Sequence, residues 1–270
     1  MNTAPSSPSV SVQCRAINYA KDSANRIHSD EYAAAQGFKG GLVPGVGDFA
    51  YLARAALQHF GPPLLEGSQL SGKFIKPVYD GELVTSQGVG TDRLELQLLN
   101  EDNVVCAIGA ASLTPDPEPE RNEFSANGPP ELMPPSLEEV RPGQSLQPYQ
   151  YRYQRAAATA DARAKFGYDN PLFVGPSASW HPALCLHDAN QMLRRSIALD
   201  AWIHTGSVVS YFRQPHDGEL LSWLGTIAKT YEKRGNIVTE ADLALFGEDD
   251  RSLVRVHHTA IIAIGKEAAA

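Results

Sequence analysis

The stretch Phe74-Ile75-Lys76-Pro77-Val78-Tyr79-Asp80-Gly81-Glu82-Leu83 returns later in the chain as Phe212-Arg213-Gln214-Pro215-His216-Asp217-Gly218-Glu219-Leu220, with one residue deleted before the second Asp-Gly-Glu. A second match lies upstream at nearly the same offset. Leu42-Val43-Pro44-Gly45 and Trp180-His181-Pro182-Ala183 both open apolar segments, and their prolines lie 138 residues apart. Two collinear matches at one spacing indicate an internal repeat.

Each copy of the repeat predicts the same order of elements. We expect long helices over residues 44–60 and 182–198, because each proline suits the first turn of a helix. Stretches with strand character follow each Asp-Gly-Glu, at residues 83–89, 94–99 and 104–113, then 220–231, 237–246 and 253–264. The first helix is apolar on most sides, so a sheet should wrap it. The sequence therefore predicts an α+β fold of two fused hotdog units, packed as a pseudo-dimer.

Residues 115–148 separate the two copies. Nine prolines fall in this interval among acidic and small residues, which is typical of a linker. We therefore divide the chain into a hotdog domain over residues 1–114, a linker over 115–148 and a second hotdog domain over 149–270. Each domain is long enough for a compact unit, and the linker should have little regular structure.

Composition excludes several classes of protein. The chain has 270 residues, 43% hydrophobic and 20% charged, as in ordinary globular proteins. Its net charge of -8 leaves no basic stripe for nucleic acid, and no segment has the roughly 18 consecutive apolar residues of a membrane span. Cys14, Cys106 and Cys185 are odd in number and widely spaced, which argues against disulfides and a zinc site. We expect a cytoplasmic protein with no metal or cofactor.

Residues 22–34 carry the most informative pattern: Asp22-Ser23-Ala24-Asn25-Arg26-Ile27-His28-Ser29-Asp30-Glu31-Tyr32-Ala33-Ala34. This stretch resembles the signature of MaoC-like, or type-2 enoyl-CoA, hydratases, which in words is Asp, any residue, Asn, Pro, aliphatic, His, five residues, then Ala or Ser. Asn25, Ile27, His28 and Ala34 stand at matching places. The passage from Gly37 to the helix at Pro44 also looks like the family. The resemblance covers roughly residues 18–82.

Two positions depart from that signature. Arg26 stands in the place of the proline, and Ser23 stands in the place of the catalytic Asp, with Asp22 one residue early. A serine cannot act as a carboxylate. Either the loop shifts to present Asp22, or another acid such as Asp30 substitutes, or the hydratase chemistry is altered or lost.

The resemblance implies a site for hydration of an enoyl thioester. This reaction needs a base for the water proton, a proton donor for the α carbon, and dipoles aimed at the thioester oxygen. His28 is expected to be the base, since its ordinary pKa lies near neutrality, and the free N–H of Gly45 at a helix start would bind the oxyanion. The residues assigned to the site are His28, Asn25, Asp22 and Ser23 for catalysis, and Gly45, Val46 and His181 for oxyanion and substrate binding.

The second copy has lost the equivalent residues. Phe166-Gly167-Tyr168-Asp169-Asn170-Pro171-Leu172-Phe173 echoes the signature, but Phe173 stands where the histidine would be. We therefore expect a single, asymmetric site. His204 and the pair His257-His258 fall in strand-like sequence without metal-ligand spacing, and we interpret them as structural.

Three functions remain open. The first is a hydratase or dehydratase acting on an acyl-CoA or an acyl-carrier thioester. The second is a hotdog thioesterase, which could manage without the missing Asp, and the third is a non-catalytic acyl-binding protein. A homodimer of double hotdogs is also open.

Overall fold

A computed structural model describes residues 10–265. The N-terminal copy contains β1 (Val10–Arg15), η1 (Arg26–His28), α1 (Asp30–Ala35), α2 (Gly45–Phe60), η2 (Pro62–Leu65), β2 (Ser68–Phe74), β3 (Leu83–Val89), β4 (Arg93–Leu99) and β5 (Val105–Ser112). The C-terminal copy contains β6 (Tyr149–Arg152), α3 (Arg155–Phe166), η4 (Pro171–Phe173), α4 (Leu184–Ser196), β7 (Ile203–Tyr211), β8 (Leu220–Lys233), β9 (Asn236–Phe246) and β10 (Ser252–Ala263).

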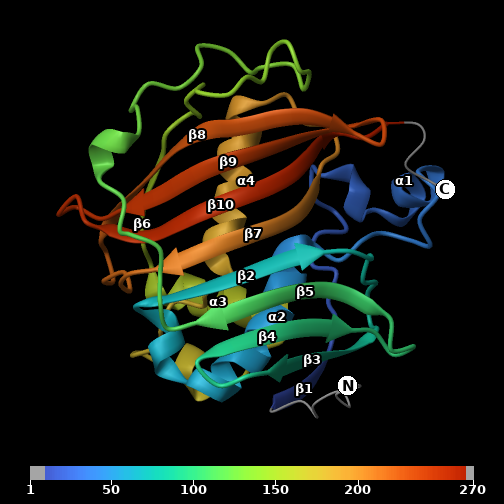
Figure 1. Ribbon diagram of the computed structural model, residues 1–270, viewed down its shortest axis with the longest axis vertical. Coiled ribbons are helices and arrows are strands. Elements are labelled where there is room, and N and C mark those ends of the chain that lie inside the picture. Colours follow the sequence, from blue (N-terminus) through green and yellow to red (C-terminus); the bar gives the residue numbers. More distant parts are fainter. Residues whose placement is uncertain (1–9, 266–270) are drawn as a thin grey trace, which may run out of the picture.

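All of these strands form one sheet, in the order β1-β3-β4-β5-β2-β7-β10-β9-β8-β6 (Figure 1). The order of the second half repeats that of the first in reverse, as a two-fold axis between β2 and β7 requires. These two central strands pair antiparallel from Ser68↔Tyr211 to Lys73↔Gly206. The sheet is therefore continuous across the two copies.

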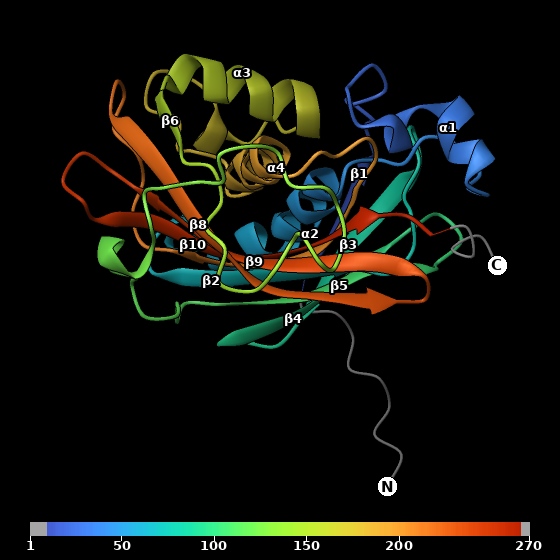
Figure 2. The same cartoon turned by 90° about the horizontal axis from the view of Figure 1, so that it is seen from above.

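Helices α2 and α4 lie side by side on the same face of the sheet (Figure 2). Phe49, Tyr51 and Leu52 of α2 are fully buried, so this helix is wrapped as its apolar composition predicts. The strands alternate accordingly: Leu94 of β4 faces the core and Arg93 faces solvent. This arrangement is a hotdog fold in each half, and it confirms the expected α+β fold of two fused hotdogs.

Some elements differ from the expectation. Helix α4 begins at Leu184 instead of residue 182, because the Leu184 N–H bonds to the His181 carbonyl in a turn that precedes the helix. Helix α3 was not expected at all. Only Ala162 and Phe166 of α3 are buried, so it has no apolar stripe that would mark it as a helix in the sequence.

The repeated Asp-Gly-Glu forms the same turn in both halves. Gly81 and Gly218 have φ values of 77° and 82°, a region that favours glycine. In each turn the glutamate accepts a hydrogen bond from the backbone N–H three residues earlier, at 3.0 Å for Glu82 and 2.9 Å for Glu219. The repeat that divides the sequence is thus a structural device at the entry to β3 and β8.

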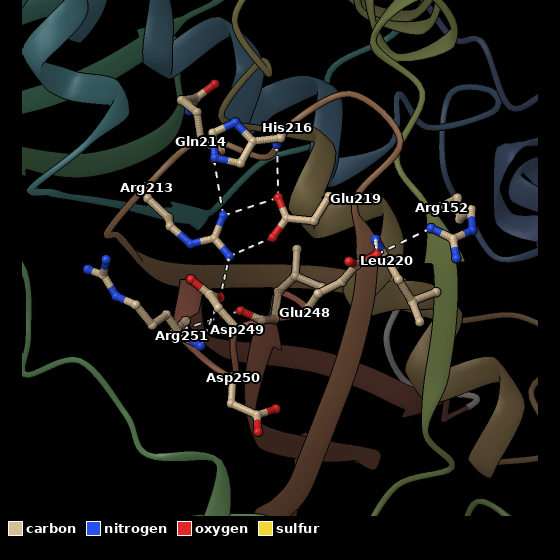
Figure 3. A network of polar contacts seen from close by, with 12 residues as sticks. Arg152, Arg213, Gln214, His216, Glu219, Leu220, Glu248, Asp249, Asp250 and Arg251 are labelled. Atoms are coloured by element: carbon tan, nitrogen blue, oxygen red, sulfur yellow. Dashed lines mark hydrogen bonds and ion pairs between the residues drawn. The ribbon is translucent and has the colours of Figure 1, made fainter.

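In the second half an ion-pair network reinforces this turn (Figure 3). The Arg213 guanidinium lies 2.6 Å from a carboxylate oxygen of Glu219 and 3.0 Å from one of Asp249. Arg152 pairs with Glu248 at 3.2 Å. The network ties the start of β8 to the turn between β9 and β10.

Residues 115–148 run between the two copies with one short 3-10 helix, η3 (Arg121–Glu123). Isolated bridges join Met133 to Ile197 and Ser145 to Thr226. The segment therefore packs on the C-terminal copy at these points. The division of the chain at this segment stays a prediction.

Candidate active site

A large open cavity of about 1690 Å³ lies where the two copies meet. Residues from both copies line it. Among them are His28, Gly45, Asp48 and Phe74 from the N-terminal copy, and His204 and Ser207 from the C-terminal copy.

His28 closes η1 and is half-buried. Its Nδ1 lies 2.8 Å from the Leu42 carbonyl oxygen. A carbonyl can only accept, so Nδ1 carries the proton and Nε2 carries the lone pair. Burial lowers the pKa of His28, and the hydrogen bond to Leu42 opposes this effect. The ring is therefore a neutral base, held in one tautomer.

Asn25 fixes this loop to the other half of the protein. It is buried, and its side-chain amide exchanges two hydrogen bonds with the backbone of Trp202, at 2.9 and 3.1 Å. The second N–H of the amide points to Nε2 of His28 at 3.1 Å. Trp202 is held in turn, because its indole N–H bonds to Asn190 of α4 at 3.1 Å. Asn25 thus positions His28 against the start of β7.

The first turn of α2 presents free N–H groups. Pro44 is the N-cap, and within residues 10–265 no hydrogen-bond partner lies at the N–H of Gly45 or Val46. A Cβ at Gly45 would lie 2.9 Å from the His204 carbonyl oxygen and 2.9 Å from Cε2 of Phe74. Only glycine fits this close approach. The Val46 side chain is buried in the core and does not line the cavity.

The loop acids lie elsewhere. Asp22 and Ser23 are exposed and outside the cavity lining. Asp30 accepts a hydrogen bond from the Gly41 N–H at 2.8 Å and so braces the loop. None of the three stands beside His28 as the acid that the hydratase signature places there.

The equivalent site of the second copy is filled. Phe173 is buried at the place that corresponds to His28, and its ring lies 4.7 Å from that of His181. Phe166 and Tyr168 also pack on His181, at 4.9 and 5.4 Å. Burial lowers the pKa of His181 to about 3, with a smaller contribution from Arg54. His181, expected in substrate binding, is therefore outside the cavity and part of this aromatic packing.

Sequence analysis interprets His204 and His258 as structural and misses that His204 lines the cavity. Nε2 of His204 lies 2.8 Å from Oγ of Ser207, which lies 3.0 Å from Nδ1 of His258. The two rings stack at 4.3 Å. Nδ1 of His204 is buried without a partner among the described residues, beside Gly45.

Sequence reasoning also missed Asp48, which lies one turn inside α2. Its side chain is 4% exposed, and Oδ1 has no hydrogen-bond partner in residues 10–265. Burial, and next the charge of Glu82, raise the pKa of Asp48 well above its ordinary value. An acidic residue in the first turn of a helix is ordinarily explained by its favourable interaction with the helix dipole. The sequence therefore offers no reason to assign Asp48 to the site.

Between residues 10 and 265, no three His, Cys, Asp or Glu side chains gather as metal ligands would. No helix in the same range is both long and apolar enough to cross a bilayer.

Comparison with known proteins identifies the architecture. No protein-family model matches the chain, and no curated protein matches it. Solved structures do match along nearly its whole length. A MaoC-like dehydratase is 11% identical with a TM-score of 0.62, covering 94% of this chain and 98% of that one. A conserved Mycobacterium tuberculosis protein with a double hotdog fold, essential for bacterial survival during infection, is 11% identical with a TM-score of 0.60, covering 94% and 96%.

The chain has the double hotdog fold. Its likeness to MaoC-like proteins is thereby confirmed at the level of fold. The same double hotdog also resembles a Lactobacillus plantarum protein provisionally described as an oleoyl thioesterase, at 12% identity and a TM-score of 0.55, over 97% of this chain and 98% of that one. Solved structures with this fold are thus described both as a dehydratase and, provisionally, as a thioesterase.

Proposed function

We propose that the protein adds water to the double bond of an enoyl thioester and removes it again from a 3-hydroxyacyl thioester. The acyl group would be carried by coenzyme A or by a carrier protein. One observation carries this proposal: a neutral histidine, His28, and the free N–H of Gly45 line the same cavity. A base and an oxyanion donor are two of the three groups that the reaction requires.

His28 would activate the water. In the resting site its Nε2 accepts from the Asn25 amide at 3.1 Å. The reacting water would replace this contact in order to reach the lone pair of Nε2. The ring then takes a proton from the water while the water oxygen attacks the β carbon. The bonds from Asn25 to Trp202 keep the loop in place during this exchange.

Gly45 would stabilise the negative charge that follows. As the water adds, the electron pair of the double bond moves toward the thioester oxygen. The Gly45 N–H lies at the positive end of α2, where an oxyanion is favoured. Such a donor typically contributes about 3 kcal/mol in the transition state.

The cavity wall suits an acyl chain. Beside the polar groups it contains the apolar side chains of Ile27, Leu42, Val43, Phe74 and Ile203. An apolar wall of this kind binds hydrocarbon.

A thioesterase is the second candidate. The exposure of Asp22 removes the loop acid of the hydratase signature, while the carboxyl group of Asp48 lines the cavity. A carboxylate can direct water against the carbonyl carbon of a saturated thioester. The resemblance to a provisional oleoyl thioesterase is in line with this alternative.

A panel of thioesters separates these functions. The protein is incubated with crotonyl, longer enoyl and saturated acyl-CoA, and loss of the double bond and release of free thiol are followed separately. A hydratase removes the double bond and releases no thiol. Thiol release from saturated substrates would establish the thioesterase, and saturable binding without turnover would establish an acyl-binding protein.

A further inference from the structure

We propose that Asp48 is the proton donor of this site and takes the place of the acid that the loop lacks. The inference rests on the proposed function and completes it, since it names the group that protonates the α carbon. The side chain comes from the helix that also provides the oxyanion donor, at a position that the hydratase signature does not include.

The surroundings of Asp48 are those of a functional group. It lies one turn after Gly45 on α2 and lines the same cavity. Its carboxyl group is buried, and no hydrogen bond within residues 10–265 reaches Oδ1. Burial of a polar group without a hydrogen bond costs stability. A buried carboxyl that faces a cavity without a partner is therefore best explained by a ligand that provides one.

Asp188 shows what a structural carboxylate looks like in this protein. It lies in the first turns of α4, the counterpart of α2, and it does not line the cavity. Its Oδ2 accepts hydrogen bonds from the Tyr151 hydroxyl at 2.7 Å and from the Trp223 indole N–H at 3.3 Å. The carboxyl group of Asp188 on α4 thus has hydrogen-bond donors. That of Asp48 on α2 lines the cavity, and its Oδ1 has no partner within residues 10–265.

Burial, and next the negative charge of Glu82, favour the protonated form of Asp48. The titratable groups near it are Tyr19 before η1, Tyr51 on α2, Glu82 at the entry to β3, and Cys106 on β5. None of these four is a cation. The raised pKa of Asp48 thus favours a carboxylic acid with a proton to give, while the lowered pKa of His28 favours a neutral base. A protonated acid and a neutral base in one cavity are the usual arrangement for acid-base catalysis.

The step balances as follows. Water adds its oxygen to the β carbon and gives one proton to Nε2 of His28. The double-bond electrons form an enolate, whose oxygen is held by the Gly45 N–H. The α carbon then takes the proton of Asp48, which leaves a carboxylate. A proton passes from the imidazolium to this carboxylate through water, and the site is restored.

The variant Asp48→Asn tests this assignment, with Asp188→Asn as its matched control. Asparagine has nearly the same shape and no charge, so the fold is retained. Hydration by Asp48→Asn should have a kcat reduced roughly 10²-fold or more, the usual scale for a positioned acid. KM should change little. The alkaline limb of the kcat profile should disappear, because it reports the loss of the Asp48 proton. Asp188→Asn should keep both the turnover and the limb.

A second readout needs no substrate. Above neutral pH, the infrared band of a protonated carboxylic acid should be present in the wild type and in Asp188→Asn, and absent from Asp48→Asn. A persistent band, or an Asp48→Asn variant with normal turnover and an intact alkaline limb, would overturn the assignment while the hydratase function stands. A wild-type protein that hydrates no enoyl thioester would overturn the proposed function and this role together.

Discussion

Asn25 and Trp202 lie 177 residues apart in the chain, yet the Asn25 side chain exchanges hydrogen bonds with both the N–H and the carbonyl of Trp202. One side chain thereby joins the loop that carries His28 to the strand that brings His204 into the cavity. The site depends on this junction between the two copies.

Replacing Asn25 with alanine should loosen that junction. The buried N–H and carbonyl of Trp202 would lose their partners, which should lower the free energy of unfolding by about 1–3 kcal/mol. Denaturant unfolding measures this loss. Asn122→Ala is the control, since Asn122 is exposed and its side chain donates to Glu120, two residues away. Equal stability of Asn25→Ala and wild type would show that the junction contributes nothing.

Gly45→Ala should impair the oxyanion donor. The new Cβ would lie 2.9 Å from the His204 carbonyl oxygen, so the start of α2 must move. A displacement of this kind can cost about 10²-fold in turnover. Gly47→Ala is the control in the same helix, because its Cβ meets Cγ1 of Val43 at 3.1 Å and nothing else closer than 3.8 Å. Steady-state kinetics measure the turnover of both variants. Similar turnover in the two would argue against Gly45 as the oxyanion donor.

The acid limb of the activity profile should report His28. The base must be neutral, and burial lowers its pKa. Activity should therefore persist below the ordinary histidine pKa of about 6.5 and fall only at lower pH. Measurement of kcat/KM against pH gives the midpoint. His216→Ala, at an exposed residue outside the cavity, should leave it unchanged. A midpoint above the ordinary value would mean that another group titrates.

Asp48→Asn should stabilise the protein increasingly as pH rises. Below the ordinary Asp pKa of about 3.9, the folded and unfolded wild-type chains both hold the proton, so burial adds no pH-dependent cost. Above it the unfolded chain ionises and the folded one does not, because its pKa is raised. Wild-type stability therefore falls until pH reaches the folded pKa, and the advantage of the variant grows by up to about 1.4 kcal/mol per pH unit.

Asp80→Asn should change the pH dependence of stability in the opposite direction. Hydrogen bonds from Lys21 and from the Asn18 N–H lower the pKa of Asp80. That carboxylate stabilises the fold above its ordinary pKa, and the effect is lost as pH falls through the lowered value. Asp80→Asn should therefore be less stable than wild type at neutral pH and approach it in acid. Unfolding measured across pH for both variants checks the pair, and parallel curves would refute it.

Much of the fold could be predicted because its landmarks are local. Gly81 and Gly218 mark turns that need a positive φ, and Pro44 marks a helix start. Helix α3 could not be predicted, since only Ala162 and Phe166 are buried in it. The strand pairing of β2 with β7 joins residues far apart in sequence, and no local pattern specifies it.

The site could be predicted only in part, for the same physical reason. His28, Asn25 and Gly45 belong to continuous motifs, and all three were expected. Asp48 and His204 reach the cavity through tertiary packing. Nothing in the residues next to Asp48 shows that its carboxyl lacks a partner, because that depends on β5 and on the start of β3.

The central claim is tested most directly by the hydration of crotonyl-CoA by wild type and by His28→Ala, followed as the loss of absorbance of the conjugated double bond. We predict saturable hydration by the wild type and a turnover reduced roughly 10²-fold or more in His28→Ala. Neither protein should release free thiol. Equal turnover of the two proteins, or release of thiol in place of hydration, would contradict it.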